Sequence, residues 1–127
     1  MTEPEKRDLI ERYLSAYNAF DVDGMMDTLH PQIEFENISG GEVNATASGA
    51  DEFRQIAQRA TGLFSSRNQT VRVFEANEKG AAIEVSYEGV LAADLPNGMK
   101  AGEILQLNGR SEFEFKEGKI SRIVDRS

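Results

Sequence analysis

The sequence has no cysteine, no tryptophan, a single histidine and only three prolines among its 127 residues. Without cysteine, disulfide bonds, thiolate metal ligands and a cysteine nucleophile are excluded. One histidine without cysteine does not supply the ligand set of a zinc site, and we expect neither a metal nor a cofactor. A glycine-rich phosphate-binding loop and an ordered Ser–His–Asp set are also missing.

Long hydrophobic runs and an excess of positive charge are absent as well. No apolar stretch approaches the roughly 20 residues of a membrane-spanning helix, so we expect no membrane partner. Residues 1–12 are charged and lack the apolar centre of a secretory signal, so we expect a cytoplasmic protein. The 14 basic and 22 acidic residues give a formal net charge of −8, which would repel nucleic acid and anionic membranes. The same charge disfavours highly anionic substrates unless a local basic pocket compensates for it.

Three helices are predicted in the first half of the chain, whose length fits one domain covering residues 1–127. Residues 5–20 carry apolar side chains at helical spacing, which form one stripe. A short helix over residues 22–29 follows the capping residue Asp21 and ends before Pro31. A third helix is predicted over residues 50–64. The apolar stripe of the first helix consists of Leu9, Ile10, Tyr13, Leu14 and Tyr17.

Strands are predicted wherever apolar and polar residues alternate with a period of two. Glu117-Gly118 supplies a tight turn before the last strand. Pro96-Asn97-Gly98 contains the Asn-Gly signal of a short hairpin. Residues 39–48 and 65–69 are expected to be loops, and Gly102 and Gly109 are expected to mark bulges or bends in the long strand. The predicted strands cover residues 33–37, 71–76, 83–87, 99–116 and 120–125.

This order of elements predicts an α+β fold. About three N-terminal helices would pack on the concave face of a cone-shaped, curved sheet that is mainly antiparallel. Helices that cross the concave side of such a sheet leave a space suited to a small, largely apolar organic ligand. We therefore expect the functional side chains to point into this cone.

The alternation also selects polar residues for the inner face of the sheet. Asn37, Tyr87 and Ser111 share the apolar sides of their strands, and Tyr13 and Tyr17 face them from the first helix. His30 stands before a proline at a helix end, where a solvated or helix-dipole role competes with catalysis. The last strand is ambiguous from its own pattern. Either Ile120, Arg122 and Val124 or Ser121, Ile123 and Asp125 point inward.

Several segments together resemble the nuclear transport factor 2-like superfamily, and within it the SnoaL-like and ketosteroid-isomerase-like members. The resemblance covers nearly the whole chain and implies the cone fold described above. This superfamily includes isomerases, cyclases, epoxide hydrolases, dehydratases and non-enzymatic binding modules, so the fold alone does not assign a function. The segments that carry the resemblance are residues 12–13, 18–24, 29–35, 48–49, 95–100 and 113–120.

The resemblance also suggests roles for individual residues. Tyr13 matches the oxyanion-donating tyrosine of the isomerase-like members. Asn37 and Ser111 stand where those isomerases keep a carboxylate base and a protonated acid, so steroid-type isomerase chemistry is not expected. Asp125 matches the last-strand carboxylate of SnoaL-like cyclases, which favours the inward orientation of Asp125. Epoxide hydrolases of this fold add an arginine–aspartate pair, and residues 87–90 lack that arginine.

Two functional interpretations follow. In the first, a cofactor-free enzyme catalyses proton-transfer isomerisation or cyclisation of a small apolar carbonyl compound, with Asp125 as base and Tyr13 and Asn37 as hydrogen-bond donors. In the second, the domain is a non-catalytic ligand-binding or dimerisation module, and Asp125 is a solvated carboxylate near the chain end. The resemblance also implies a homodimer through the outer sheet face, where Ile104 and Val124 lie among charges. The expected ligand contacts are Tyr17, His30, Phe35, Phe53, Tyr87, Ser111, Phe113 and Ile123.

Overall fold

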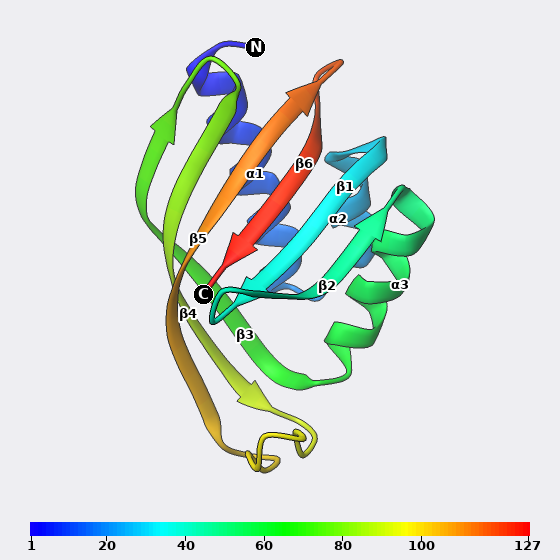
Figure 1. The fold of residues 1–127 in the computed structure, drawn as a ribbon, viewed down its shortest axis with the longest axis vertical. Coiled ribbons are helices and arrows are strands. Elements are labelled where there is room, and N and C mark those ends of the chain that lie inside the picture. Colours follow the sequence, from blue (N-terminus) through cyan, green and yellow to red (C-terminus); the bar gives the residue numbers. More distant parts are fainter.

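The computed structural model describes residues 1–127, in which three helices cover one face of a six-stranded sheet (Figure 1). The strand order is β2-β1-β6-β5-β4-β3, and only the neighbours β1 and β6 run parallel. This is the α+β arrangement predicted from the sequence. The helices are α1 (Glu3–Asn18), α2 (Val22–Asp27) and α3 (Ala50–Thr61). The strands are β1 (Leu29–Ser39), β2 (Glu42–Ser48), β3 (Phe64–Ala76), β4 (Gly80–Leu91), β5 (Ile104–Lys116) and β6 (Lys119–Arg126).

Helix α1 is closed at both ends by its own residues. At its start, the Thr2 side chain accepts from the Glu5 backbone N–H at 3.3 Å, and Glu5 Oε1 accepts from the Thr2 N–H at 2.9 Å. This capping box satisfies two N–H groups that the helix leaves free. At its end, the N–H of Phe20 donates to Tyr17 O at 3.1 Å, and the N–H of Asp21 donates to Ala16 O at 2.8 Å.

The residue that follows this helix end has an uncommon backbone conformation. Phe20 has a φ of 59°, in the left-handed region that glycine usually occupies at this position. A non-glycine residue pays about 1–2 kcal/mol for it. The cost is tolerated here because the Phe20 ring packs over the guanidinium of Arg67, a residue of β3.

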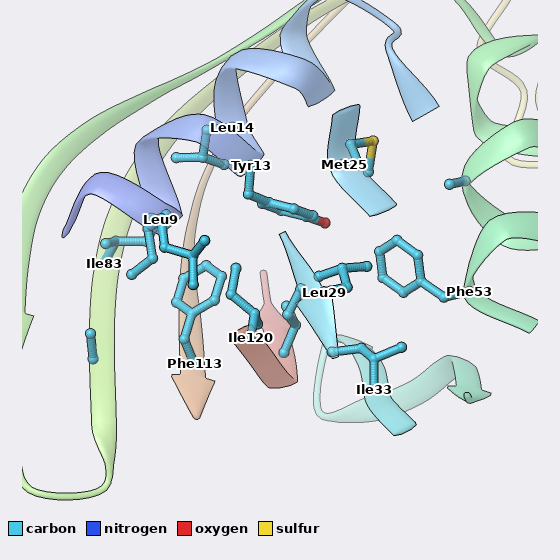
Figure 2. Packing of buried hydrophobic residues seen from close by; sticks show 14 of the residues in the cluster. Leu9, Tyr13, Leu14, Met25, Leu29, Ile33, Phe53, Ile83, Phe113 and Ile120 are labelled. Atoms are coloured by element: carbon cyan, nitrogen blue, oxygen red, sulfur yellow. The ribbon is translucent and has the colours of Figure 1, made fainter. Parts of the chain in front are cut away.

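The hydrophobic core lies between α1, α2, α3 and the inner face of the sheet (Figure 2). Helix α1 contributes Leu9, Ile10, Tyr13 and Leu14, which are all buried as the apolar stripe predicts. The Tyr13 ring lies 6.4 Å from the rings of both Phe53 and Phe113, so it joins the helical layer to the sheet. The most deeply buried aliphatic side chains of the chain are Ile10, Ile33, Ile83, Leu91, Ile120 and Ile123.

Two segments expected to be loops are strands instead. Residues 42–48 form β2, which pairs with β1 after a turn at Gly40 and Gly41. Residues 65–69 belong to β3, which begins at Phe64 and so limits the third helix to residues 50–61. Both strands lie at the edges of the sheet. Edge strands expose much of their surface and carry polar side chains, which conceals them from a search for hydrophobic alternation.

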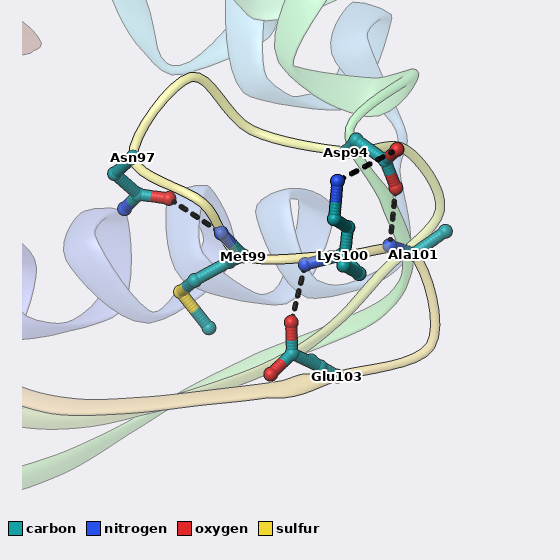
Figure 3. Close-up of polar contacts among 6 residues, drawn as sticks. All are labelled: Asp94, Asn97, Met99, Lys100, Ala101 and Glu103. Atoms are coloured by element: carbon teal, nitrogen blue, oxygen red, sulfur yellow. Dashed lines mark hydrogen bonds and ion pairs between the residues drawn. The ribbon is translucent and has the colours of Figure 1, made fainter.

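The long C-terminal strand begins at Ile104 rather than at residue 99. Residues 92–103 form a loop, which Figure 3 shows to be held by its own polar side chains. Asp94 Oδ1 accepts from the N–H of Ala101 at 2.9 Å, and Asn97 Oδ1 accepts from the N–H of Met99 at 3.1 Å. The Asn-Gly pair therefore lies in a long loop and not in a two-residue hairpin.

The two glycines expected to interrupt the long strand have other roles. Gly102 lies in the loop with a φ of 89°. Gly109 lies in β5, where a Cβ would come within 2.9 Å of Arg126 O. Close approach of β6 therefore explains this glycine, because the strand register is regular there and the irregularity lies at Glu114 and Phe115.

The outer face of the sheet is dominated by paired charges. Arg126 contacts Glu112 at 2.8 Å, and Arg122 contacts Glu114 at 3.5 Å. Val124 pairs with neighbours on this face but is only 5% exposed, so it does not form the apolar patch expected there. No helix of the chain has both the length and the apolar character needed to span a membrane.

Candidate functional site

A cavity of about 620 Å³ opens between the helices and the inner face of the sheet. A second cavity of about 280 Å³ adjoins it. Tyr17, Asn37 and Asp125 line both, so these three side chains stand where the two spaces meet. The larger cavity is mostly apolar and is also lined by Tyr13, Met25, Phe35, Phe53, Ile56, Leu63 and Arg67, among others.

Asp125 lies in the middle of a polar group carried by three neighbouring strands. In the strand register it is opposite Asn37 of β1 on one side and opposite Ser111 of β5 on the other. The Ser111 hydroxyl donates to Asp125 Oδ1 at 2.6 Å. Burial raises the pKa of Asp125 to about 6, and the hydrogen bond from Ser111 opposes this rise. A carboxyl group with this pKa is suited to exchange protons near neutral pH.

Tyr13 offers a hydroxyl group that is not engaged by any other side chain. Its ring is buried, and Figure 2 shows the oxygen pointing toward the side of the core where Met25 and Phe53 lie. Burial, and then the nearby charge of Asp125, raise the pKa of Tyr13 well above its ordinary value. The hydroxyl therefore stays protonated and is available as a donor to a ligand in the cavity.

A second pair of tyrosines closes the boundary between the two cavities. The Tyr17 hydroxyl donates to the Tyr87 hydroxyl at 3.1 Å, and their rings meet edge to face at 6.3 Å. Burial is the largest cause of a raised pKa in both residues. Both hydroxyls are therefore neutral at ordinary pH and serve only as hydrogen-bonding groups.

Asn37 is oriented by the edge strand β2. Its Nδ2 donates to Asn44 Oδ1 at 2.7 Å. This contact leaves the second N–H and the carbonyl oxygen of the amide for other partners. Asn37 is therefore a fixed polar group beside Asp125, with one donor and one acceptor available to a ligand.

Arg67 is a site residue that the sequence pattern did not indicate. It lies in β3 within the segment expected to be a loop, and it is only 5% exposed. Its Nε donates to Tyr17 O at 2.9 Å, and its guanidinium lies 3.7 Å over the Tyr17 ring. Neither Nη1 nor Nη2 has a hydrogen-bond partner, although both are buried. An unsatisfied buried donor costs about 1–3 kcal/mol, and more when it is charged.

Three of the expected ligand contacts lie outside both cavities. His30 starts β1 instead of ending a helix, and its Nε2 contacts Glu117 Oε1 at 3.2 Å at the β5–β6 turn. Phe113 packs beneath Tyr13 in the core, and Ile123 is completely buried. The side chains that the structure brings together around the cavities are Tyr13, Tyr17, Phe35, Asn37, Phe53, Tyr87, Ser111 and Asp125. No three His, Asp or Glu side chains converge as a metal-binding group.

Comparison with known families and structures adds an independent line of evidence. The family model described as a SnoaL-like domain matches residues 10–123. No curated protein matches the sequence significantly.

Solved structures with the same fold cover almost the entire chain. A proposed polyketide cyclase from Xanthomonas campestris is 22% identical, with a TM-score of 0.80 over 98% of this chain and 90% of that chain. A proposed SnoaL-like polyketide cyclase from Jannaschia is 11% identical, with a TM-score of 0.82 over 97% of this chain and 85% of that chain. AclR, a proposed hydroxylase from Streptomyces galilaeus, is 16% identical, with a TM-score of 0.78 over 98% and 89% of the two chains. At these identities the likeness establishes the fold alone.

Proposed function

The chain belongs to the SnoaL-like domain family, and from this premise we propose that it is a cofactor-free enzyme acting on a small carbonyl compound. The proposed reaction is a proton transfer that leads to isomerisation or cyclisation. The observation that carries the proposal is the position of Asp125, a carboxyl group with a raised pKa that lines a mostly apolar cavity. Two structural neighbours proposed to be polyketide cyclases act, by that name, on related chemistry.

In the first step, the ionised Asp125 removes a proton from the carbon next to the substrate carbonyl. The C–H bond breaks, an O–H bond forms on Asp125, and the electron pair moves toward the carbonyl oxygen. The free hydroxyl of Tyr13 donates to that oxygen and stabilises the enolate as its charge develops. Asn37 supplies a second donor through its remaining N–H.

The second step depends on the substrate. In an isomerisation, the protonated Asp125 returns the proton to a different carbon, and the carboxylate is regenerated. In a cyclisation, the enolate carbon attacks a second carbonyl of the same molecule, and Asp125 donates its proton to the new alkoxide. Ser111 holds Oδ1 throughout, so Oδ2 is the oxygen left to carry the proton.

The experiment that tests this proposal starts from the ligand. Native mass spectrometry of the purified protein, together with a thermal-shift panel of small ketones and diketones, identifies compounds that bind. Exchange of their α-hydrogens in heavy water is then followed by NMR with and without protein. We expect exchange that increases as the pH rises through about 6, because the base must be ionised. Binding without any exchange would favour the non-catalytic ligand-binding module.

A further inference from the structure

The guanidinium of Arg67 is a buried charge whose two terminal nitrogens have no partner. The residue is 5% exposed, and no Asp, Glu or Lys side chain of the chain is as deeply buried. Neither Nη1 nor Nη2 makes a hydrogen bond, and no carboxylate lies within ion-pair distance of Arg67. A buried charge is ordinarily paired, so this one lacks the anion that would complete it.

The contacts of Arg67 hold it in place without using those nitrogens. Its Nε donates to Tyr17 O at the end of α1, at 2.9 Å. Its guanidinium plane lies 3.7 Å from the Tyr17 ring centre and 4.6 Å from the Phe20 ring centre. These contacts orient the side chain toward α1 and leave the two-pronged end of the guanidinium free.

The same side chain lines the larger cavity together with Asp125. The charged residues that line this cavity are Arg59, Arg67 and Asp125, so cations outnumber the single carboxylate. The whole chain has the opposite balance, with a formal net charge of −8. The cavity is thus a local basic site in an acidic protein, which attracts an anionic ligand.

We propose that Arg67 anchors a carboxylate of the ligand, so that the ligand is an organic acid. The planar fork of an arginine matches the two oxygens of a carboxylate, which explains why both Nη atoms are left without protein partners. The inference rests on the proposed function, in that the acidic C–H of the same molecule faces Asp125. It replaces the expected apolar ligand by a small carbonyl compound that carries a carboxylate.

The covering of Arg67 indicates how such a ligand enters. Both Nη atoms are shielded from solvent, so a carboxylate reaches them only when a covering ring moves. Phe20 is the more mobile cover, because it is half-exposed and lies beyond the end of α1 in a left-handed conformation. Tyr17 is held by its hydrogen bond to Tyr87.

Binding of matched acids and amides tests the proposal. The probes are benzoate with benzamide and 2-naphthoate with 2-naphthamide, titrated near pH 7.5 by calorimetry or NMR. We expect the wild-type protein to bind each acid roughly tenfold or more tightly than its amide, the scale of a charge-assisted hydrogen bond. Arg67→Met is expected to reduce this preference to about twofold or less. Arg54→Met, the same change outside the cavity, is expected to keep it.

A measurement on the wild-type protein covers the case in which Arg67→Met fails to fold. With ¹⁵N-labelled arginine, the acids are expected to shift the Arg67 side-chain resonances and the amides to leave them unchanged. Equal affinity for acid and amide, no binding of any probe, or a preference that survives in Arg67→Met would overturn the proposal. Asp125→Asn separates it from the proposed function, because that variant abolishes exchange while the preference for acids remains.

Discussion

The hydroxyl of Ser111 donates a 2.6 Å hydrogen bond to Asp125 across the antiparallel pair β5–β6, at the point where these residues are opposite each other. This contact opposes the effect of burial on the pKa of Asp125. Ser111→Ala should therefore raise the pKa of Asp125 further, because the ionised form loses its donor. The rising limb of the pH–rate profile should move to higher pH, as followed by α-hydrogen exchange. A limb that stays in place, or moves to lower pH, would show that the contact does not stabilise the carboxylate.

The same carboxyl group should make the folded protein less stable at high pH. Its folded pKa of about 6 lies above the ordinary value of 3.8, so the fold favours the neutral form. The stability contribution is complete below the ordinary value and is lost as the pH rises through the folded pKa. Asp125→Asn should therefore unfold at higher denaturant concentration than wild type near pH 8, by up to about 3 kcal/mol. The gain should shrink steadily as the pH falls from 6 toward 4, and a gain independent of pH would contradict this.

The packing of α1 is tested by a charge in its apolar stripe. Leu14 is 5% exposed and belongs to the main core cluster. Leu14→Asp should unfold the protein, because an unpaired buried charge costs several kcal/mol against a total stability of roughly 5–15 kcal/mol. Ser15→Asp, on the exposed side of the same helix, is the control and should melt cooperatively. Circular dichroism during heating distinguishes the two, and a near-native midpoint for Leu14→Asp would contradict the described packing.

The homodimer through the outer sheet face stays a prediction. Ile104 is 57% exposed and Val73 is 40% exposed, and both lie on this face, since they pair with Val90 and Glu84 in the register. Light scattering at micromolar concentration should give a dimer mass for the wild-type protein. Ile104→Glu should give a monomer, because it places a charge in an apolar contact. Val43→Glu, at the exposed β1–β2 hairpin, is the matched control. A monomer mass for the wild-type protein at every concentration would reject the prediction.

The parts of the fold that could be predicted from the sequence are those with one buried and one exposed face. The stripe of α1 and the alternation in β4, β5 and β6 are of this kind. The segments that were misjudged, β2 and the start of β3, are the two edges of the sheet, where the hydrophobic pattern is weak. Their existence depends on long-range pairing with β1 and β4, which no local pattern reports.

The candidate site divides in the same way. Asp125, Asn37 and Ser111 could be placed on one face, because period-two alternation and the family resemblance select the same residues. Arg67 could not, because it lies in a polar run of an edge strand. Its burial results from the end of α1, where Tyr17 and Phe20 cover it. Contacts between elements far apart in the sequence create this feature, so the sequence pattern alone does not reveal it.

Replacement of the proposed base is the most direct test of the central claim. Asp125→Asn keeps the size of the side chain and can still accept the hydrogen bond from Ser111, but it cannot take up a proton. The rate of α-hydrogen exchange should fall by roughly a hundredfold or more, the scale of general-base losses, while ligand affinity stays nearly unchanged. Asp8→Asn, an exposed carboxylate of α1, should retain the wild-type rate. An unchanged exchange rate in Asp125→Asn would contradict the account of Asp125 as the catalytic base.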